Sequence, residues 1–69
     1  MLSPLRVMLN GESRELPAVT TIADLIALLE VRGRYAVEIN GEIAPRSTHA
    51  EHRLANGDRV EVVAAIGGG

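Results

Sequence analysis

Apolar and polar residues alternate near the start of the chain. Over residues 5–9 every second side chain is apolar, and Asn10-Gly11, a pair that tolerates the positive φ angles of a tight turn, follows directly. Residues 13–16 are expected to fold back antiparallel, and Pro17 ends this second strand because proline lacks a backbone donor. The pattern predicts an opening hairpin. Its expected inward residues are Leu5, Val7, Leu9 and Leu16.

A helical spacing follows the hairpin. Within residues 22–30 the apolar positions recur three, four and seven residues apart, which predicts an amphipathic helix. Thr21 is the expected N-cap, and Asp24 is placed to return a reciprocal contact to the cap backbone. Gly33 is the expected stop. The predicted core-facing residues are Ile22, Leu25, Ile26 and Leu29.

Two further strands are predicted beyond the helix. Residues 36–39 form a short apolar run that ends at a second Asn-Gly pair, and residues 59–66 are rich in β-branched side chains. The intervening residues 43–55 have no clean period, which indicates irregular structure with a short helical turn, anchored by Leu54. Along the last strand the apolar pattern changes phase near Val62, so the sequence does not assign its two faces.

This order of elements predicts an α+β fold. A hairpin, a helix, a strand, an irregular crossing and a last strand fit the β-grasp (ubiquitin-like) architecture, in which one main helix packs across one face of a small mixed sheet. A ferredoxin-like arrangement needs a second full helix, and the pattern offers none. We expect residues 1–66 to form this domain and residues 67–69 to be a flexible C-terminal glycine tail.

Composition excludes several classes of function. The chain has no cysteine, which rules out disulfides, a thiol nucleophile and thiolate metal sites within it. Its net charge is -2, its seven basic residues are scattered, and Tyr35 is its single aromatic residue, so nothing indicates nucleic-acid binding. The apolar runs are too short to cross a membrane, and no secretory signal is visible. We therefore expect a soluble, cytoplasmic protein.

Side chains with catalytic or metal-binding potential do not form a convincing set. His49 and His52 are three residues apart, but no third ligand accompanies them, and both are expected to be exposed loop histidines rather than a metal site. No serine has an oriented histidine and acid beside it. A chain of 69 residues is also not expected to enclose a ligand-sized cleft. These observations predict that the protein is not an enzyme.

The C-terminal residues suggest a different kind of chemistry. The predicted last strand runs through Ile66 into Gly67, Gly68 and Gly69 with no polar spacer, and the sequence ends there. Glycines carry no side-chain chemistry, so a function at this position belongs to the backbone and its carboxylate. Three extended residues span roughly 10 Å, which suits insertion into the active site of another protein.

Four stretches, taken together, resemble the ThiS family, the bacterial sulfur carriers of thiamine biosynthesis. They are residues 7–12, 21–25, 37–47 and 56–69, in an order and spacing that cover nearly the whole chain. The resemblance implies a β-grasp fold with the first and last strands adjacent and parallel. It also implies a protein co-substrate whose terminal carboxylate, on Gly69, is activated by other proteins.

The resemblance further implies partners and a modification. A ThiF-type adenylyltransferase would use ATP with Mg²⁺ to adenylate Gly69, recognising Gly67 and Gly68 in the tail. Sulfur from a cysteine desulfurase or sulfurtransferase would then convert Gly69 to 1-thioglycine, and a ThiG-type thiazole synthase would receive that sulfur. The chain itself would bind no cofactor or metal.

Docking of the folded body is expected to use the sheet face opposite the helix. The candidate contact residues are Met8, Val63, Ala65 and Ile66. Two alternatives in the same class are the small subunit of molybdopterin synthase and another sulfur carrier. An alternative from a different class is a ubiquitin-like interaction or conjugation module, which would use the same tail with lysine as the acceptor.

Overall fold

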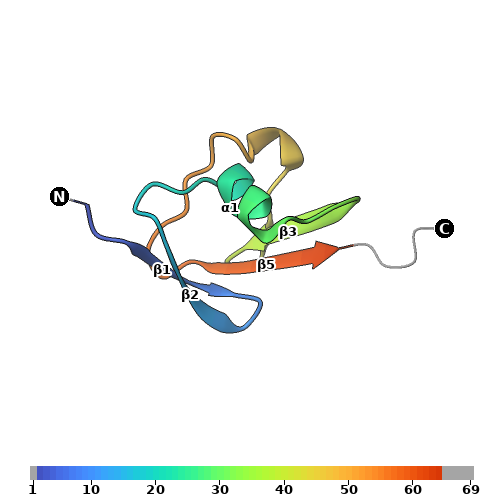
Figure 1. The fold of residues 1–69 in the computed structure, drawn as a ribbon. Helices are drawn as coiled ribbons and strands as arrows, with labels where there is room; N and C mark the ends of the chain where they lie inside the picture. Colours follow the sequence, from blue (N-terminus) through green and yellow to red (C-terminus); the bar gives the residue numbers. More distant parts are fainter. Residues whose placement is uncertain (1, 65–69) are drawn as a thin grey trace.

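In the computed structural model, which describes residues 2–64, five strands form one sheet and one α-helix crosses a face of it (Figure 1). A short 3₁₀ helix lies between the fourth and fifth strands. The elements are β1 (Leu5–Leu9), β2 (Glu12–Leu16), α1 (Ile22–Leu29), β3 (Tyr35–Ile39), β4 (Glu42–Ile43), η1 (Arg46–Thr48) and β5 (Arg59–Ala64). The predicted α+β class and β-grasp arrangement are confirmed.

The last strand of the sequence lies in the middle of the sheet. The strand order is β2-β1-β5-β3-β4, so β5 lies between β1 and β3. It pairs parallel with β1 and antiparallel with β3, while β1–β2 and β3–β4 are antiparallel hairpins. The parallel contact of first and last strands is therefore present.

Two Asn-Gly turns close these hairpins. Asn10 and Gly11 have φ angles of 48° and 84°, and Asn40 and Gly41 have 52° and 87°. Positive φ at both central positions matches the right-handed twist of paired strands. Both predicted turns are thus correct. The second turn leads into β4, a strand that the sequence pattern missed because only two residues pair.

The start of α1 follows the prediction and its end does not. The Asp24 amide donates to the Thr21 hydroxyl at 3.1 Å, and the Thr21 amide donates to the Asp24 carboxylate at 3.0 Å. The prediction that Gly33 ends the helix is wrong. Glu30 takes the left-handed conformation, with a φ of 55°, and the helix ends there. Its amide donates to the Ala27 carbonyl at 3.2 Å.

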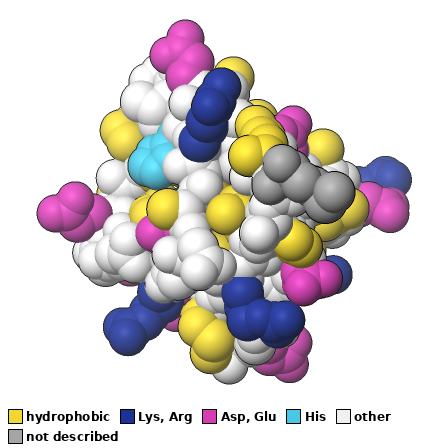
Figure 2. Space-filling view, turned by 90° about the vertical axis from the view of Figure 1, so that its left-hand side faces the viewer, with side chains coloured by type: hydrophobic (Ala, Val, Ile, Leu, Met, Phe, Trp, Pro, Cys, Tyr) yellow, Lys and Arg dark blue, Asp and Glu magenta, His cyan; other side chains and the backbone are white. Residues whose placement is uncertain are grey.

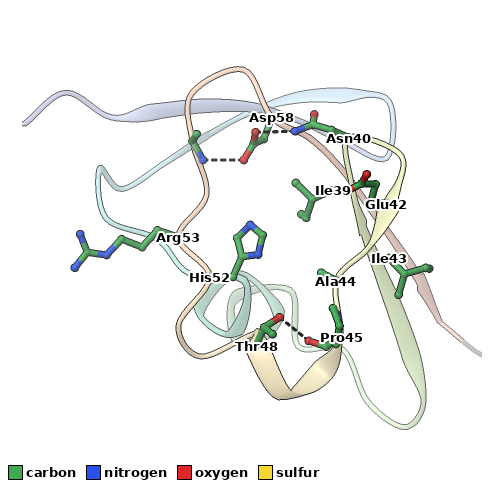
Figure 3. A pocket seen from close by; sticks show the side chains of 11 residues that line it. Ile39, Asn40, Glu42, Ile43, Ala44, Pro45, Thr48, His52, Arg53 and Asp58 are labelled. Atoms are coloured by element: carbon green, nitrogen blue, oxygen red, sulfur yellow. Dashed lines mark hydrogen bonds between the residues drawn. The ribbon is translucent and has the colours of Figure 1, made fainter.

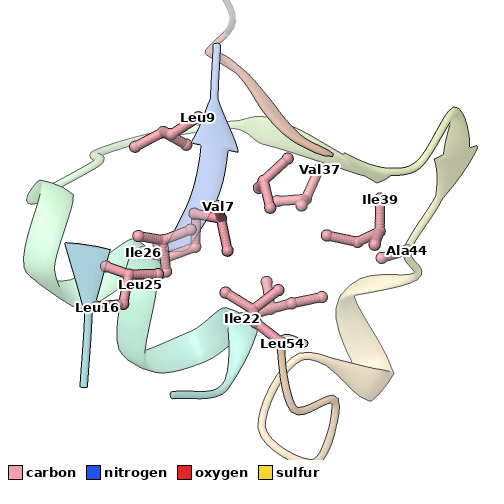
Figure 4. Close-up of a cluster of buried hydrophobic side chains, with 11 residues drawn as sticks. Val7, Leu9, Leu16, Ile22, Leu25, Ile26, Val37, Ile39, Ala44 and Leu54 are labelled. Carbon is pink, nitrogen blue, oxygen red and sulfur yellow. The ribbon is translucent and has the colours of Figure 1, made fainter. Parts of the chain in front are cut away.

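The core lies between α1 and the inner face of the sheet, which is the face that the helix covers (Figure 4). Eleven buried apolar residues form it, drawn from all strands except β4, from α1 and from the loops. They are Val7, Leu9, Leu16, Ile22, Leu25, Ile26, Val37, Ile39, Ala44, Leu54 and Val60. Leu5 and Leu29 pack against this cluster while remaining partly exposed, so the predicted inward faces of the hairpin and helix are confirmed.

The crossing from η1 to β5 is tied to the start of the helix. The Leu54 amide donates to the Thr20 carbonyl at 2.9 Å, and the Ile22 amide donates to the His52 carbonyl at 3.0 Å. Leu54 is buried, as predicted for the anchor of this segment. These contacts hold an otherwise irregular stretch against the core.

Leucines on the two sides of α1 give a matched test of this packing. Leu25 is fully buried, whereas the Leu28 side chain is 58% exposed. We expect Leu25→Ala to lower the free energy of unfolding by about 2–5 kcal/mol, because it removes buried area and leaves a cavity. Leu28→Ala should change it by less than about 0.5 kcal/mol. Urea denaturation of both variants measures the difference, and equal losses would contradict the assigned core.

Candidate partner-binding face

The sheet face opposite α1, called the outer face below, is defined by strand alternation. Along β5, Val60 is buried and Val62 is half-buried on the helix side, while Glu61 and Val63 are exposed on the outer face. The alternation holds through Val63 without a change of phase, so the structure assigns the faces that the sequence left open. Register places these residues on the outer face: Arg6, Met8, Ser13, Glu15, Ala36, Glu38, Ile43, Arg59, Glu61 and Val63.

Three large aliphatic side chains are exposed on the outer face. Met8 is 41% exposed, Ile43 62% and Val63 60%. The predicted candidates Met8 and Val63 therefore share a face, but they are not neighbours. Met8 lies opposite Arg59, and Val63 lies four residues further along β5, roughly 13 Å away. Ile43 was missed because it follows the second turn in a region predicted to be irregular.

A like-charged pair lies between these aliphatic residues. Glu38 on β3 is directly opposite Glu61 on β5, and Ile43 flanks Glu38 on β4. Among residues 2–64 the only ion pair is Arg6–Glu15 at 3.4 Å, so neither glutamate has a basic group within 4.0 Å in that range. Like charges placed opposite each other across strands destabilise a sheet. The outer face thus holds two opposed carboxylates that form no ion pair within residues 2–64 and lie beside exposed aliphatic groups.

Both Asn-Gly turns also hold β5 through their asparagine side chains. The Val62 amide donates to Asn10 Oδ1 at 2.8 Å, and Asn10 Nδ2 donates to the Val62 carbonyl at 3.3 Å. At the other end of the strand the Arg59 amide donates to Asn40 Oδ1 at 2.9 Å. Asn40 Nδ2 donates to Asp58 Oδ1 at 3.0 Å. The sequence indicated the turns but gave no sign of these side-chain contacts.

The residues of the predicted tail lie outside the described part of the chain. They are Gly67, Gly68 and Gly69, together with the candidate contact residues Ala65 and Ile66. The last described residue of β5 is Ala64, which pairs with Tyr35 at the beginning of β3. Ala64 is therefore the described residue nearest in sequence to the predicted tail.

The expectation that both histidines are exposed is wrong, most clearly for His49. Its side chain is only 5% exposed, because the turn after η1 brings the ring beneath Tyr35, with ring centroids 6.0 Å apart. His49 Nε2 lies 2.9 Å from the Ala44 carbonyl oxygen. The guanidinium group of Arg46 lies over the Tyr35 ring, with its central carbon 4.4 Å from the ring centroid. The His49 side chain therefore contributes to packing between η1 and β3. His52 is half-buried and no group of three His, Asp or Glu in residues 2–64 is placed to hold a metal ion.

An open hollow of about 640 Å³ lies between the second turn, η1 and the loop before β5 (Figure 3). Its volume falls within the range of ligand pockets, so the expectation that so short a chain forms no ligand-sized cleft is wrong. His52 points into it, as Figure 3 shows. Two polar side chains that line the hollow, Thr48 and Asp58, bond to nearby backbone groups. The Ala55 amide donates to the Asp58 carboxylate at 2.8 Å, and the Thr48 hydroxyl donates to the Pro45 carbonyl at 2.7 Å.

Neither the distribution of surface charge nor the length of the helices in residues 2–64 indicates another kind of binding partner. Acidic and basic side chains are interspersed over the face shown in Figure 2, with no large area of one sign. Within residues 2–64, no helix is long and apolar enough to span a bilayer. The outer face is one surface of the described residues on which exposed aliphatic groups and acidic side chains occur together.

Comparison with known proteins identifies the family. The ThiS family model matches residues 7–69. The crystal structure of the thiamine biosynthesis protein (ThiS) from Geobacter metallireducens superposes with a TM-score of 0.78 at 26% identity, covering 94% of this chain and all of that one. A thiazole synthase from Paramagnetospirillum magneticum is 42% identical over 66 residues, which are 94% of this chain and 20% of that protein. The chain thus spans about a fifth of the length of that relative. The chain belongs to the ThiS family.

Proposed function

We propose that this chain is a sulfur carrier of thiamine biosynthesis, a protein co-substrate rather than an enzyme. The observation that carries the proposal is the extent of the family match, which runs from β1 through Gly69. The mixed sheet supports it, since its central strand leads toward that residue. The same match favours a ThiS-type carrier over the small subunit of molybdopterin synthase.

The proposed chemistry takes place on the Gly69 carboxylate. A carboxylate is a poor electrophile, so a ThiF-type adenylyltransferase would join it to the α-phosphate of ATP, with Mg²⁺, and release pyrophosphate. The persulfide of a cysteine desulfurase or sulfurtransferase would then displace AMP and form an acyl disulfide. A thiol would reduce that disulfide, leaving Gly69 as 1-thioglycine and releasing the sulfur donor as a disulfide with the thiol. ATP and Mg²⁺ belong to the activating enzyme, and a reaction that consumes ATP fits a cytoplasmic protein.

Thiazole synthase is the proposed sulfur acceptor. The relative from Paramagnetospirillum magneticum bears that name, and a segment of it is 42% identical to this chain. In that protein a carrier-like segment is therefore part of a longer thiazole synthase polypeptide. This supports a ThiG-type thiazole synthase as the partner that takes sulfur from Gly69.

The tail and the outer face would divide the work of recognition. Glycine at positions 67 and 68 would let the backbone enter a narrow channel without a Cβ atom. Fixing three glycines costs roughly 1–2 kcal/mol each in backbone entropy, so docking of the body must offset that. Burial of Met8, Ile43 and Val63 on the outer face is the proposed source of this binding energy, and Ala65 and Ile66 stay candidate contacts that lie outside the described residues.

Intact mass measurement tests the carrier function. Incubation with ATP, Mg²⁺, the adenylyltransferase of the same organism and a sulfur donor should add the mass difference between one sulfur and one oxygen. A chain without Gly68 and Gly69 should melt at the same temperature, because it loses no side chain, and should gain no mass. An unmodified full chain would refute the carrier proposal, and ligation to lysines would support the conjugation module.

Two exposed valines test the docking face. Val63 is on the outer face, while Val19 is exposed beside α1. Because burying a valine is worth about 1.5–3 kcal/mol, Val63→Glu should weaken binding to the adenylyltransferase by roughly 10- to 100-fold. Val19→Glu should bind like the unmodified chain. Titration calorimetry gives both affinities, and equal effects would place the interface elsewhere.

The glutamate pair tests whether the outer face receives a cationic partner residue. Glu61→Gln should raise the free energy of unfolding by about 0.2–1 kcal/mol, because it removes repulsion from Glu38. If the activating enzyme places an arginine or lysine there, the same change should weaken binding. Glu51→Gln, an identical charge change outside the sheet, should do neither. Thermal unfolding and calorimetry measure the two effects, and tighter or unaltered binding of Glu61→Gln would exclude the cation.

A further inference from the structure

The strand that leads toward the tail extends beyond the strand beside it. β1 pairs with β5 at only two positions, Met8↔Arg59 and Leu9↔Val60, and the chain then turns at Asn10-Gly11. The Asn10 amide donates to the Val60 carbonyl at 2.9 Å, which is the last backbone contact on this side of β5 among residues 2–64. Beyond it β5 continues to Ala64, paired on its other side with β3.

The Asn10 side chain takes the place of a neighbouring strand at the next position of β5, Val62. Its carboxamide accepts from the Val62 amide at 2.8 Å and donates to the Val62 carbonyl at 3.3 Å. A neighbouring strand would offer the same donor and acceptor to that residue. Asparagine meets two requirements together here, since it tolerates a φ of 48° and carries both hydrogen-bonding groups. Val62 is thus held from both sides, by Asn10 and by β3, whereas Val63 and Ala64 pair with β3 alone.

Asn40 provides a natural comparison within the same chain. It occupies the same place in the other Asn-Gly turn, has a φ of 52°, and also makes two side-chain hydrogen bonds, one to the Arg59 amide and one to Asp58. Its contacts are at the beginning of β5, whereas those of Asn10 are near the end. The two residues therefore differ mainly in their distance from the tail.

We propose that Asn10 is a positioning residue for the reaction at Gly69, an inference that rests on the proposed carrier function. Gly69 is the seventh residue after Val62, a reach of at most about 25 Å for a fully extended chain. A change of about 10° in the direction of the strand at Val62 would displace Ala64, the last described residue of β5, by about 1 Å and would redirect the point from which the remaining residues continue. Holding Val62 on both sides restricts this direction before the partner binds, so less ordering remains for the partner to impose.

Asn10→Gly and Asn40→Gly form the matched test. Glycine adopts positive φ without strain, so each variant removes the carboxamide while keeping the turn. Both should lower the melting temperature by similar amounts. Only Asn10→Gly should speed hydrogen exchange of the Val62 amide, and Asn10→Asp, which keeps an acceptor but loses the donor, should have an intermediate effect.

Pyrophosphate release by the ThiF-type adenylyltransferase, measured over a range of carrier concentrations at a temperature where all variants are folded, gives the functional result. Asn10→Gly should lower kcat by roughly 10-fold with little change in KM, because the docking face is intact and the carboxylate is misplaced. Asn40→Gly should retain the kcat of the unmodified chain.

The outcomes separate this inference from the function on which it rests. An unmodified chain that releases no pyrophosphate with the enzyme would refute the carrier proposal. If that chain is activated and the two glycine variants show equal kcat values, the positioning role of Asn10 is refuted. Faster exchange at Val62 with full kcat would refute it as well, by showing that the contact stabilises the sheet only.

Discussion

Placement of β5 in the centre of the sheet is the constraint on which the rest of the structure depends. Its inner side supplies Val60, a fully buried core residue, and its two edges join the β1–β2 hairpin to the β3–β4 hairpin. The turn before it is fixed as well, because the Arg6 amide donates to the Asn56 side chain at 2.8 Å across 50 residues of sequence. The core therefore forms only when the chain returns to its beginning, and the strand that completes the core also leads toward the predicted tail.

This arrangement separates the residues that form the core from the face proposed to bind partners. The buried aliphatic residues are on the helix side of the sheet, where α1 and the crossing segment cover them. The outer face retains exposed aliphatic groups and two carboxylates that lie opposite each other, an arrangement that disfavours strand pairing. Local violations of this kind occur in natural proteins where function requires them. A body of this design can present one face to enzymes while its core remains closed.

The sequence predicted those features that depend on neighbouring residues. Helical spacing, the capping contacts of Thr21 with Asp24, and both Asn-Gly turns were all found, and the order of elements was enough to indicate the architecture. The end of α1 was misplaced because glycine is the usual residue in the left-handed conformation, and here Glu30 adopts it. The tail residues 67–69 remain predictions, since they lie outside the described part of the chain.

The features that the sequence missed depend on distant contacts. Burial of His49 requires Tyr35, which lies on another element, and the faces of β5 were set by pairing with β3 rather than by its own pattern. The side-chain contacts of Asn10 join residues 52 positions apart, so a dipeptide signal cannot reveal them. Family resemblance supplied the adjacency of first and last strands, which periodicity alone does not specify.

The two margins of the sheet have a consequence for behaviour at high concentration. The outermost strand on one side, β2, is polar except at Leu16, and the outermost strand on the other side, β4, is only two residues long. Edge strands that are charged or very short offer few backbone groups with which a second copy of the chain could pair, and they therefore oppose aggregation. These edge strands therefore allow the protein to reach high concentrations without pairing between the sheets of neighbouring copies.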